Sequence, residues 1–115
     1  MKQATTDVSA ALLSDIEAHA ASTDAEVCGF IYENRYVAIP NVANHSNRFY
    51  GDPGTVARVL NKHGEPEIIF HSHPSGNLEL SEEDRRLWYY TNSTMMVGCM
   101  SGGRLRWKMY GKRSD

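Results

Sequence analysis

Two histidines one residue apart begin the stretch "HSHPSGNLELSEED", residues 71–84, which ends in an aspartate. Imidazole nitrogens and carboxylate oxygens are both good zinc ligands, and three such ligands leave one tetrahedral position open for water. Zinc lowers the pKa of the water that it binds to about 7, which supplies hydroxide at neutral pH. These residue types therefore predict one zinc ion per chain, held by His71, His73 and Asp84, and hydrolysis of an amide or a related bond.

The residues that flank the two histidines predict how the side chains of His71, His73 and Asp84 come together. Residues 68–70 are a short, wholly apolar run, which is the pattern of a buried strand that ends at His71. Alternate residues of a strand point to the same face, so His71 and His73 aim both rings at one place. Ser81 and Asp84 form an S-x-x-D pattern that opens a helix, which puts the aspartate in the first turn.

A zinc-activated water also needs a proton acceptor that is not itself a ligand. Glu26 is the candidate general acid/base, because in "AEVCGF" it directly precedes an apolar strand pattern. Asp24 and Glu33 are competing carboxylates nearby. Ser81 is the candidate stabiliser of a developing oxyanion, since its hydroxyl stands at the N-terminus of a helix.

The rest of the chain predicts the order α-ββ-α-β-α-ββ, a mixed α/β sheet flanked by helices. Helices are expected at residues 9–22 with Ser9 as N-cap, at residues 54–62 behind a cap at Asp52, and from Ser81 onward. Strands are expected at residues 27–32, 36–39, 68–70, 95–100 and 105–110. Residues 40–53 are a polar loop, in which Phe49 and Tyr50 are candidates for substrate contact and His45 is not expected to take part in the chemistry.

Composition excludes several classes of function. The 115 residues are 41% hydrophobic and 23% charged, which fits one domain over residues 1–115. The net charge of -2 gives no basis for nucleic-acid binding, and no apolar run is long enough to cross a membrane. Cys28 and Cys99 lie in apolar runs outside any CxxC pair, so buried free thiols are expected. The absence of an export signal favours the cytoplasm.

One charge pattern allows two interpretations. Basic residues gather near the end of the chain, at Arg104, Arg106, Lys108, Lys112 and Arg113. They fit a solvated strand face and tail, or a docking patch for an acidic partner. The first interpretation is preferred, because a cluster of like charges usually marks a solvated face.

The spacing of the candidate site residues resembles a known family. The run His71-x-His73-Pro74, six residues, Ser81, two residues, Asp84 resembles the JAMM (MPN+) zinc metalloprotease signature at every defined position. The upstream "EVCGF" is similar to that family's glutamate and glycine-containing strand. The resemblance implies zinc ligands at His71, His73 and Asp84, the general acid/base at Glu26 and a transition-state stabiliser at Ser81. It also implies a cytidine deaminase-like, three-layer fold with a curved mixed sheet between helices.

The resemblance also implies a substrate class. The segments "AHA", "CGF", "YVAIPNVANHSNRFYGDP" and "HSHPSGNLELSEEDRRL" are similar to the JAMM domain at the front of phage tail-assembly proteins, in which a second, NlpC/P60-type peptidase domain usually follows. We therefore expect a peptidase or isopeptidase in the bacterial or phage-infected host cytoplasm. Its expected substrate is the C-terminal tail of a ubiquitin-like protein or a phage tail component. Two alternatives stay open: a zinc hydrolase for a small sulfur-containing amino acid or a sulfur-carrier protein, and a non-catalytic MPN-type scaffold.

Overall fold

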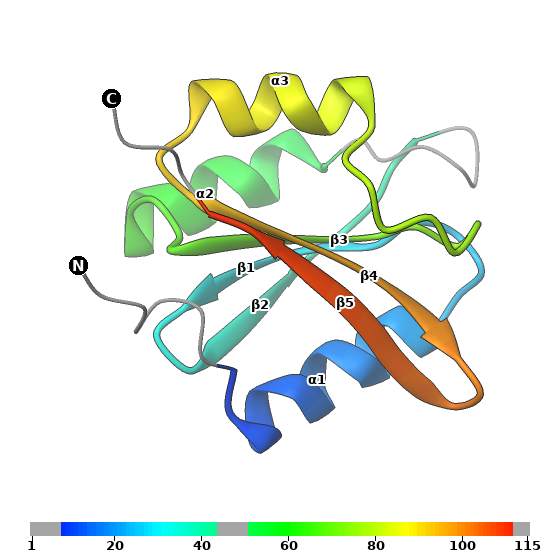
Figure 1. Cartoon of the computed structure of the whole chain (residues 1–115). Helices are drawn as coiled ribbons and strands as arrows, with labels where there is room; N and C mark the ends of the chain where they lie inside the picture. Colours follow the sequence, from blue (N-terminus) through cyan, green and yellow to red (C-terminus); the bar gives the residue numbers. More distant parts are fainter. Residues whose placement is uncertain (1–7, 44–50, 112–115) are drawn as a thin grey trace.

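The computed structural model describes residues 8–43 and 51–111, and the elements follow the predicted order (Figure 1). The helices are α1 (Ala10–Ala21), α2 (Pro53–His63) and α3 (Glu82–Tyr90). The strands are β1 (Cys28–Tyr32), β2 (Arg35–Ile39), β3 (Ile68–Ser72), β4 (Thr94–Ser101) and β5 (Arg104–Tyr110). The predicted ends of these elements agree with the structure to within two residues. His45, Phe49 and Tyr50 lie outside the described residues.

The five strands form one mixed sheet in the order β2-β1-β3-β4-β5. Strands β3 and β4 run parallel, and every other neighbouring pair is antiparallel. Helix α1 covers one face of the sheet, while α2 and α3 cover the other (Figure 1). This confirms the expected three-layer, mixed α/β architecture, with β3 at its centre.

The side chains of β3 point alternately to the two faces of the sheet, so β3 contributes to the hydrophobic core on both faces. Phe70 packs with Leu12 and Ile16 of α1, whereas Ile69 belongs to the cluster on the other side. That second cluster is covered by Val56 of α2 and by other residues of α2 and α3, namely Val59 and Trp88. Because side chains alternate along a strand, the residues that follow Ile69 by two and by four also face α2 and α3. These two residues are the histidines of the predicted site.

Side-chain caps account for the places where the helices begin. The Ser9 side chain accepts a hydrogen bond from Leu12 N at 3.1 Å at the start of α1. Asp52 accepts one from Thr55 N at 3.0 Å, directly before Pro53 at the start of α2. Each cap satisfies a backbone N–H group that has no partner within the helix. Both caps match the sequence-based expectation.

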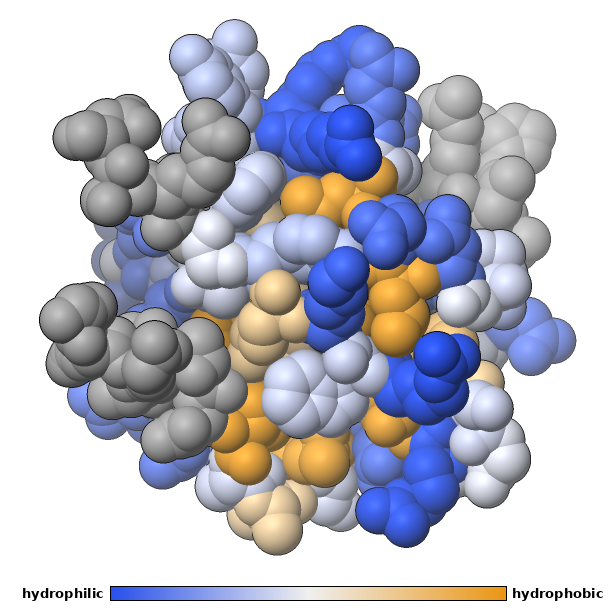
Figure 2. All heavy atoms as spheres, viewed as in Figure 1, coloured by the Kyte–Doolittle hydropathy of each residue, from blue (hydrophilic) through white to orange (hydrophobic). Residues whose placement is uncertain are grey.

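The exposed side of the edge strand β5 carries the basic residues of the C-terminal region. Arg104, Arg106 and Lys108 are exposed on β5, and Lys108 forms an ion pair with Glu79 at 3.4 Å. Figure 2 shows that this side of the molecule is mixed, with hydrophilic residues between apolar ones. The arrangement fits a solvated strand face; Lys112 and Arg113 lie outside the described residues. Among the described residues, no helix combines the length and apolar character needed to cross a bilayer.

A tyrosine and a histidine join α1 to the sheet. The Tyr36 hydroxyl lies 2.6 Å from His19 Nδ1, and its ring meets Phe70 edge-on with centroids 6.3 Å apart. Burial raises the pKa of Tyr36 well above its usual range, so the hydroxyl keeps its proton and donates it. The imidazole must then accept at Nδ1, which requires that this nitrogen carry no proton. Burial also lowers the pKa of His19, which favours the neutral ring.

We expect this pair to make the stability of the fold depend on pH. In the unfolded chain His19 titrates near its ordinary value of 6.5, and in the folded protein it titrates lower. The contribution of the pair is therefore full above the unfolded pKa and is lost as the pH falls through and below it. Thermal unfolding of the wild type and of His19→Gln, measured across this range, checks this. Glutamine can still accept from Tyr36 but does not titrate, so the variant should lose less stability in acid; identical pH dependence would contradict the assignment.

Candidate metal centre and active site

The end of β3 places both histidines on the face that α2 and α3 cover. His71 is 5% exposed and His73 is 8% exposed. Beyond the last residue of β3 the chain is still held in place, because His73 N donates to Gly98 O of β4 at 2.8 Å. His71 stands opposite Cys28 in the antiparallel register of β1 and β3. The two rings are therefore fixed by backbone pairing to both neighbouring strands.

Asp84 joins the two histidines from the first turn of α3. Its Oδ1 lies 2.9 Å from His71 Nδ1, and its Oδ2 lies 2.9 Å from His73 Nε2. Both contacts have the length of a hydrogen bond or a close ion pair. The structure thus brings the three predicted metal ligands together, with one carboxylate oxygen against each ring.

A capping box fixes the position of this carboxylate. Asp84 N donates to Ser81 Oγ at 3.0 Å, and Ser81 N donates back to Asp84 Oδ2 at 3.0 Å. The aspartate is 7% exposed, although it lies on the first turn of a helix, where most side chains face water. The S-x-x-D pattern therefore has two roles: it begins α3, and it holds Asp84 against the histidines.

A backbone carbonyl sets the tautomer of His73. The ring Nδ1 lies 2.8 Å from Asn77 O. A carbonyl oxygen only accepts, so Nδ1 carries a proton, and a neutral form of the ring would have its lone pair on Nε2. Nε2 is the nitrogen that faces Asp84. Metal-binding histidines are commonly oriented in this way, by donation from their other nitrogen to a backbone carbonyl or a carboxylate.

The side chains of His71, His73 and Asp84 shift one another's pKa values. Burial alone would raise the pKa of Asp84, but hydrogen bonds from the two histidines and the N–H of Ser81 hold it well below its usual range. Burial alone would lower the pKa of His71, and the neighbouring Cys28 and Asp84 outweigh this and raise it. The hydrogen bond to Asp84 is the largest effect on His73 and raises its pKa as well. The pKa values of both histidines are therefore raised and that of Asp84 is lowered, as expected for a carboxylate held against two imidazoles.

The chemistry of these donors fits a zinc ion, although their present arrangement is closed. Across residues 8–43 and 51–111, no three His, Cys, Asp or Glu side chains already form a metal-binding group. His71, His73 and Asp84 contact one another directly instead. Two imidazoles and one carboxylate are nevertheless a donor set typical of catalytic zinc sites, and the carbonyl of Asn77 already orients His73 for binding through Nε2.

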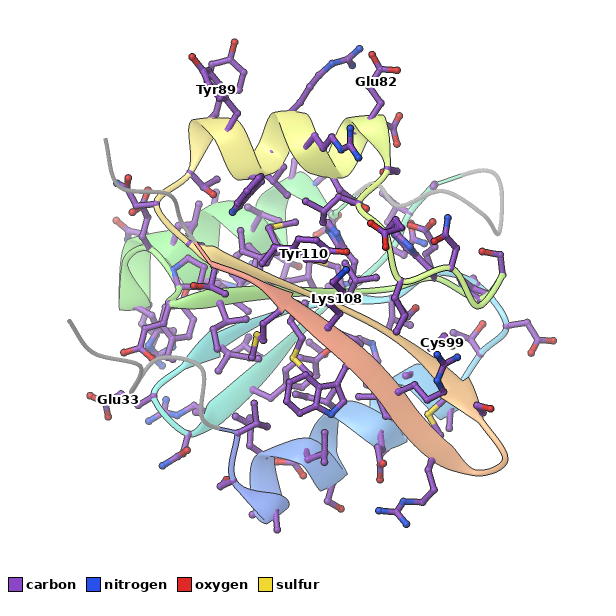
Figure 3. The ribbon with its side chains drawn as sticks, in the orientation of Figure 1. Glu33, Glu82, Tyr89, Cys99, Lys108 and Tyr110 are labelled. Atoms are coloured by element: carbon purple, nitrogen blue, oxygen red, sulfur yellow. The ribbon has the colours of Figure 1, made fainter. Side chains whose placement is uncertain are left out.

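Glu26 lies beside this cluster, directly before β1. Asn41 Nδ2 donates to the Glu26 carbonyl at 2.8 Å, which ties the chain before β1 to the chain after β2. Burial raises the pKa of the Glu26 carboxyl, the two nearby histidines lower it, and Asp84 and Glu83 raise it further. The competing Glu33 lies in the turn at the other end of β1, far from Cys99 and the site end of the sheet in Figure 3. Asp24 remains near the site.

A cleft opens beside the cluster, with a volume of about 310 Å³. It collects three carboxylates, one of the site histidines and several polar residues of the loop between β3 and α3. Its lining is Asp24, Glu26, His73, Pro74, Ser75, Asn77, Glu79 and Ser81. The cleft therefore holds both residues predicted to act on the substrate, Glu26 and Ser81, next to one predicted ligand.

Three contributions to the site could not be read from the chain. Cys28 was expected only as a buried thiol; it is buried and free, as is Cys99, but it also stands beside His71. Asn77 orients His73 through its backbone, which no residue-type pattern reveals. Tyr110 of β5 donates its hydroxyl to Leu78 O at 2.8 Å and so holds the loop that lines the cleft (Figure 3). The Cys28 and Tyr110 contacts depend on how distant segments pair, and the Asn77 contact depends on the backbone path of the loop after β3.

Comparison with known proteins identifies the family and supports the fold of this chain. The family model described as prokaryotic homologues of the JAB domain matches residues 9–110. Protein DSY2949 from Desulfitobacterium hafniense, a solved structure, is 21% identical over 89% of this chain and 80% of its own, with a TM-score of 0.68. A JAB1/MPN domain protein from Archaeoglobus fulgidus, AF2198, is 19% identical over 88% of this chain and 83% of its own, with a TM-score of 0.54. The comparison with curated proteins gave no match.

The two solved structures support the fold, and the family model supports the family. The matched residues run from the N-cap of α1 to the last residue of β5, so they contain every helix and strand. They also include the two histidines, the aspartate, the glutamate and the serine of the candidate site. The resemblance to the JAMM/MPN family is thereby confirmed. The chain belongs to the prokaryotic homologues of the JAB domain.

Proposed function

We propose that this protein is a zinc-dependent peptidase or isopeptidase. One observation carries the proposal: Asp84 lies 2.9 Å from both His71 and His73, at the edge of a cleft that also contains Glu26 and Ser81. Two imidazoles, a shared carboxylate, a second carboxylate and a hydroxyl make up a complete set of groups for hydrolysing an amide bond. His71, His73 and Asp84 would hold the metal, which when bound supplies a Lewis acid and lowers the pKa of water.

Glu26 would move the proton in this reaction. Its carboxyl lies in the same cleft as His73 but outside the cluster of predicted ligands. Burial holds the pKa of Glu26 above its usual value, which brings it closer to the pH at which the enzyme would work. The carboxylate can then take a proton from water and pass it to the leaving amine, as a general acid/base does.

Ser81 would stabilise the developing negative charge. Its oxygen accepts a hydrogen bond from Asp84 N, which leaves the hydroxyl proton free for donation to a substrate oxygen. The side chain is exposed on the cleft, and it lies at the N-terminus of α3, where the helix dipole favours negative charge. Its role as N-cap and its role towards the substrate are compatible.

We propose as substrate an extended peptide segment, such as the C-terminal tail of a ubiquitin-like protein or of a phage tail component. An open cleft lined by a loop and the end of a strand can accept an extended chain. The alternatives predict other results with the zinc-loaded protein. Turnover of a small sulfur-containing amino acid or a sulfur-carrier protein, without turnover of peptides, would favour the second enzyme class. Zinc binding without turnover of either kind of substrate would favour a scaffold.

Metal content is the first test of the proposed function. Purified protein should carry close to one zinc per chain, and the double variant His71→Ala/His73→Ala should carry essentially none, because two of the three ligands are missing. Elemental analysis together with circular dichroism separates loss of metal from loss of fold. His63→Ala, at the end of α2, is the matched control and should keep its zinc. A folded double variant with undiminished zinc would refute the ligand assignment.

A further inference from the structure

A second hollow lies at the same end of the sheet as the catalytic cleft. It has a volume of about 350 Å³ and is lined by the end of α1 and by the turn that joins β4 to β5. Both of these segments lie on the right of Figure 1. It is walled mainly by small residues of these segments. The full lining is Ala20, Ala21, Thr23, Asp24, Ala25, Ser72, Pro74, Cys99, Met100, Gly102 and Gly103.

The hollow borders the cleft that contains Glu26. Asp24 and Pro74 line both, so these two residues form a rim that the hollow and the cleft share. Successive residues at the end of β3 point to opposite faces of the sheet: Ser72 lines the second hollow and His73 lines the cleft. A substrate chain that extends from His73 over Asp24 and Pro74, across the end of the sheet, would therefore reach the second hollow.

The residues that line the second hollow determine which chemical groups it can bind. Asp24, at the rim, is the one charged residue of the lining. The Ser72 hydroxyl oxygen already accepts from Val27 N at 2.8 Å, and Ala20 and Cys99 are buried. A Cβ atom added at Gly102 or Gly103 would meet no atom of the described residues within 4 Å, so the structure leaves room beside the turn. The hollow therefore suits an uncharged, largely apolar side chain, whose transfer from water is favourable.

We propose that this hollow is a subsite for an apolar side chain of the peptide substrate, on the far side of Asp24 and Pro74 from the scissile bond. The inference rests on the proposed peptidase function, since the occupant is a residue of that enzyme's substrate. Its structural basis is independent of the metal cluster, because it depends on the space between α1 and the β4–β5 turn and on the shared rim.

A substitution that fills the hollow tests the subsite. Ala21 is the last residue of α1 and is exposed, so Ala21→Trp can occupy the hollow without disturbing the core. Ala18 is also exposed on α1 but does not line the hollow, which makes Ala18→Trp the matched control. Both variants add the same side chain to the same helix.

The first measurement is binding, and it needs neither zinc nor turnover. N-acetyl-leucine methylamide added to isotope-labelled full-length protein should shift the amide signals of Thr23, Gly102 and Gly103, and N-acetyl-aspartate methylamide should not. Ala21→Trp should weaken the leucine probe about tenfold, the effect of losing one buried leucine side chain, while Ala18→Trp should leave it unchanged. Absence of these shifts at saturating probe, or equal binding in all three proteins, would overturn the subsite.

The second measurement is turnover of internally quenched peptides that carry leucine or glycine at one position at a time. At one of these positions the wild type and Ala18→Trp should cleave the leucine peptide in preference to the glycine peptide, and Ala21→Trp should not. Cleavage with a preference that Ala21→Trp does not change would overturn the subsite and leave the proposed function intact. Binding of the leucine probe without cleavage of any peptide would overturn the proposed function and support the hollow as an apolar binding site.

Discussion

Glu26→Gln is expected to keep both the fold and the zinc and to lower kcat/KM about 10²- to 10⁴-fold, the usual contribution of a general acid/base. The amide has nearly the shape of the carboxylate, but it cannot take a proton from water. Asn41 holds residue 26 by its backbone carbonyl, so the substitution leaves that contact in place. Elemental analysis measures the zinc content, circular dichroism reports the fold, and steady-state kinetics on one peptide substrate give kcat/KM.

Asp24→Asn is the control for this prediction, because Asp24 is the competing carboxylate in the same cleft. It should retain most of the activity. The pH profile adds an independent check. Since burial raises the pKa of Glu26, the acid limb of kcat/KM should lie above 4.5, the ordinary value for a glutamate, and Glu26→Gln should lack this limb. Full activity in Glu26→Gln with a large loss in Asp24→Asn would assign the proton transfer to Asp24.

Gly29→Ala is expected to destabilise the fold by about 3 kcal/mol or more, the upper range for overpacking a core. Gly29 lies in the middle of β1, which pairs with both β2 and β3. A Cβ atom there would overlap the ring and the hydroxyl of Tyr36. The Tyr36 ring would have to move, which would disturb its hydrogen bond to His19 and its edge contact with Phe70. Chemical denaturation of the wild type and the variant measures the loss.

A second glycine provides the contrast. Gly54 lies in the first turn of α2, where the nearest atom to an added Cβ is an Asp52 oxygen at 3.7 Å. Gly54→Ala should therefore be neutral or should stabilise the protein by about 0.5–1 kcal/mol, because alanine restricts the unfolded chain and favours a helix. Similar effects at both positions would show that the contact between Gly29 and Tyr36 has no special importance.

The parts of this protein that local patterns determine could be predicted. Two histidines at i and i+2 after an apolar run must share a face, and an S-x-x-D pattern places its aspartate beside its serine, so His71, His73 and Asp84 could be grouped before any coordinates. The order and the ends of the elements followed from caps, turns and periodicity in the same way. These patterns involve residues only a few positions apart, so they can be read from the sequence alone.

The parts that depend on long-range register could not be predicted. Cys28 lies opposite His71 because β1 and β3 pair in one particular register. The sequence of neither strand reveals that register by itself. The hollow beside the cleft needs α1, the end of β3 and the β4–β5 turn to converge from three regions of the chain. The ring of Tyr36 covers Gly29 for the same kind of reason, since β2 must fold back on β1 with these residues offset.

The shared capping acid has a consequence for the fold and for the proposed chemistry together. Asp84 begins α3 through its contact with Ser81 N, and the same side chain lies against the rings of His71 and His73. One substitution at this position therefore affects the start of a helix and the grouping of the candidate ligands at the same time.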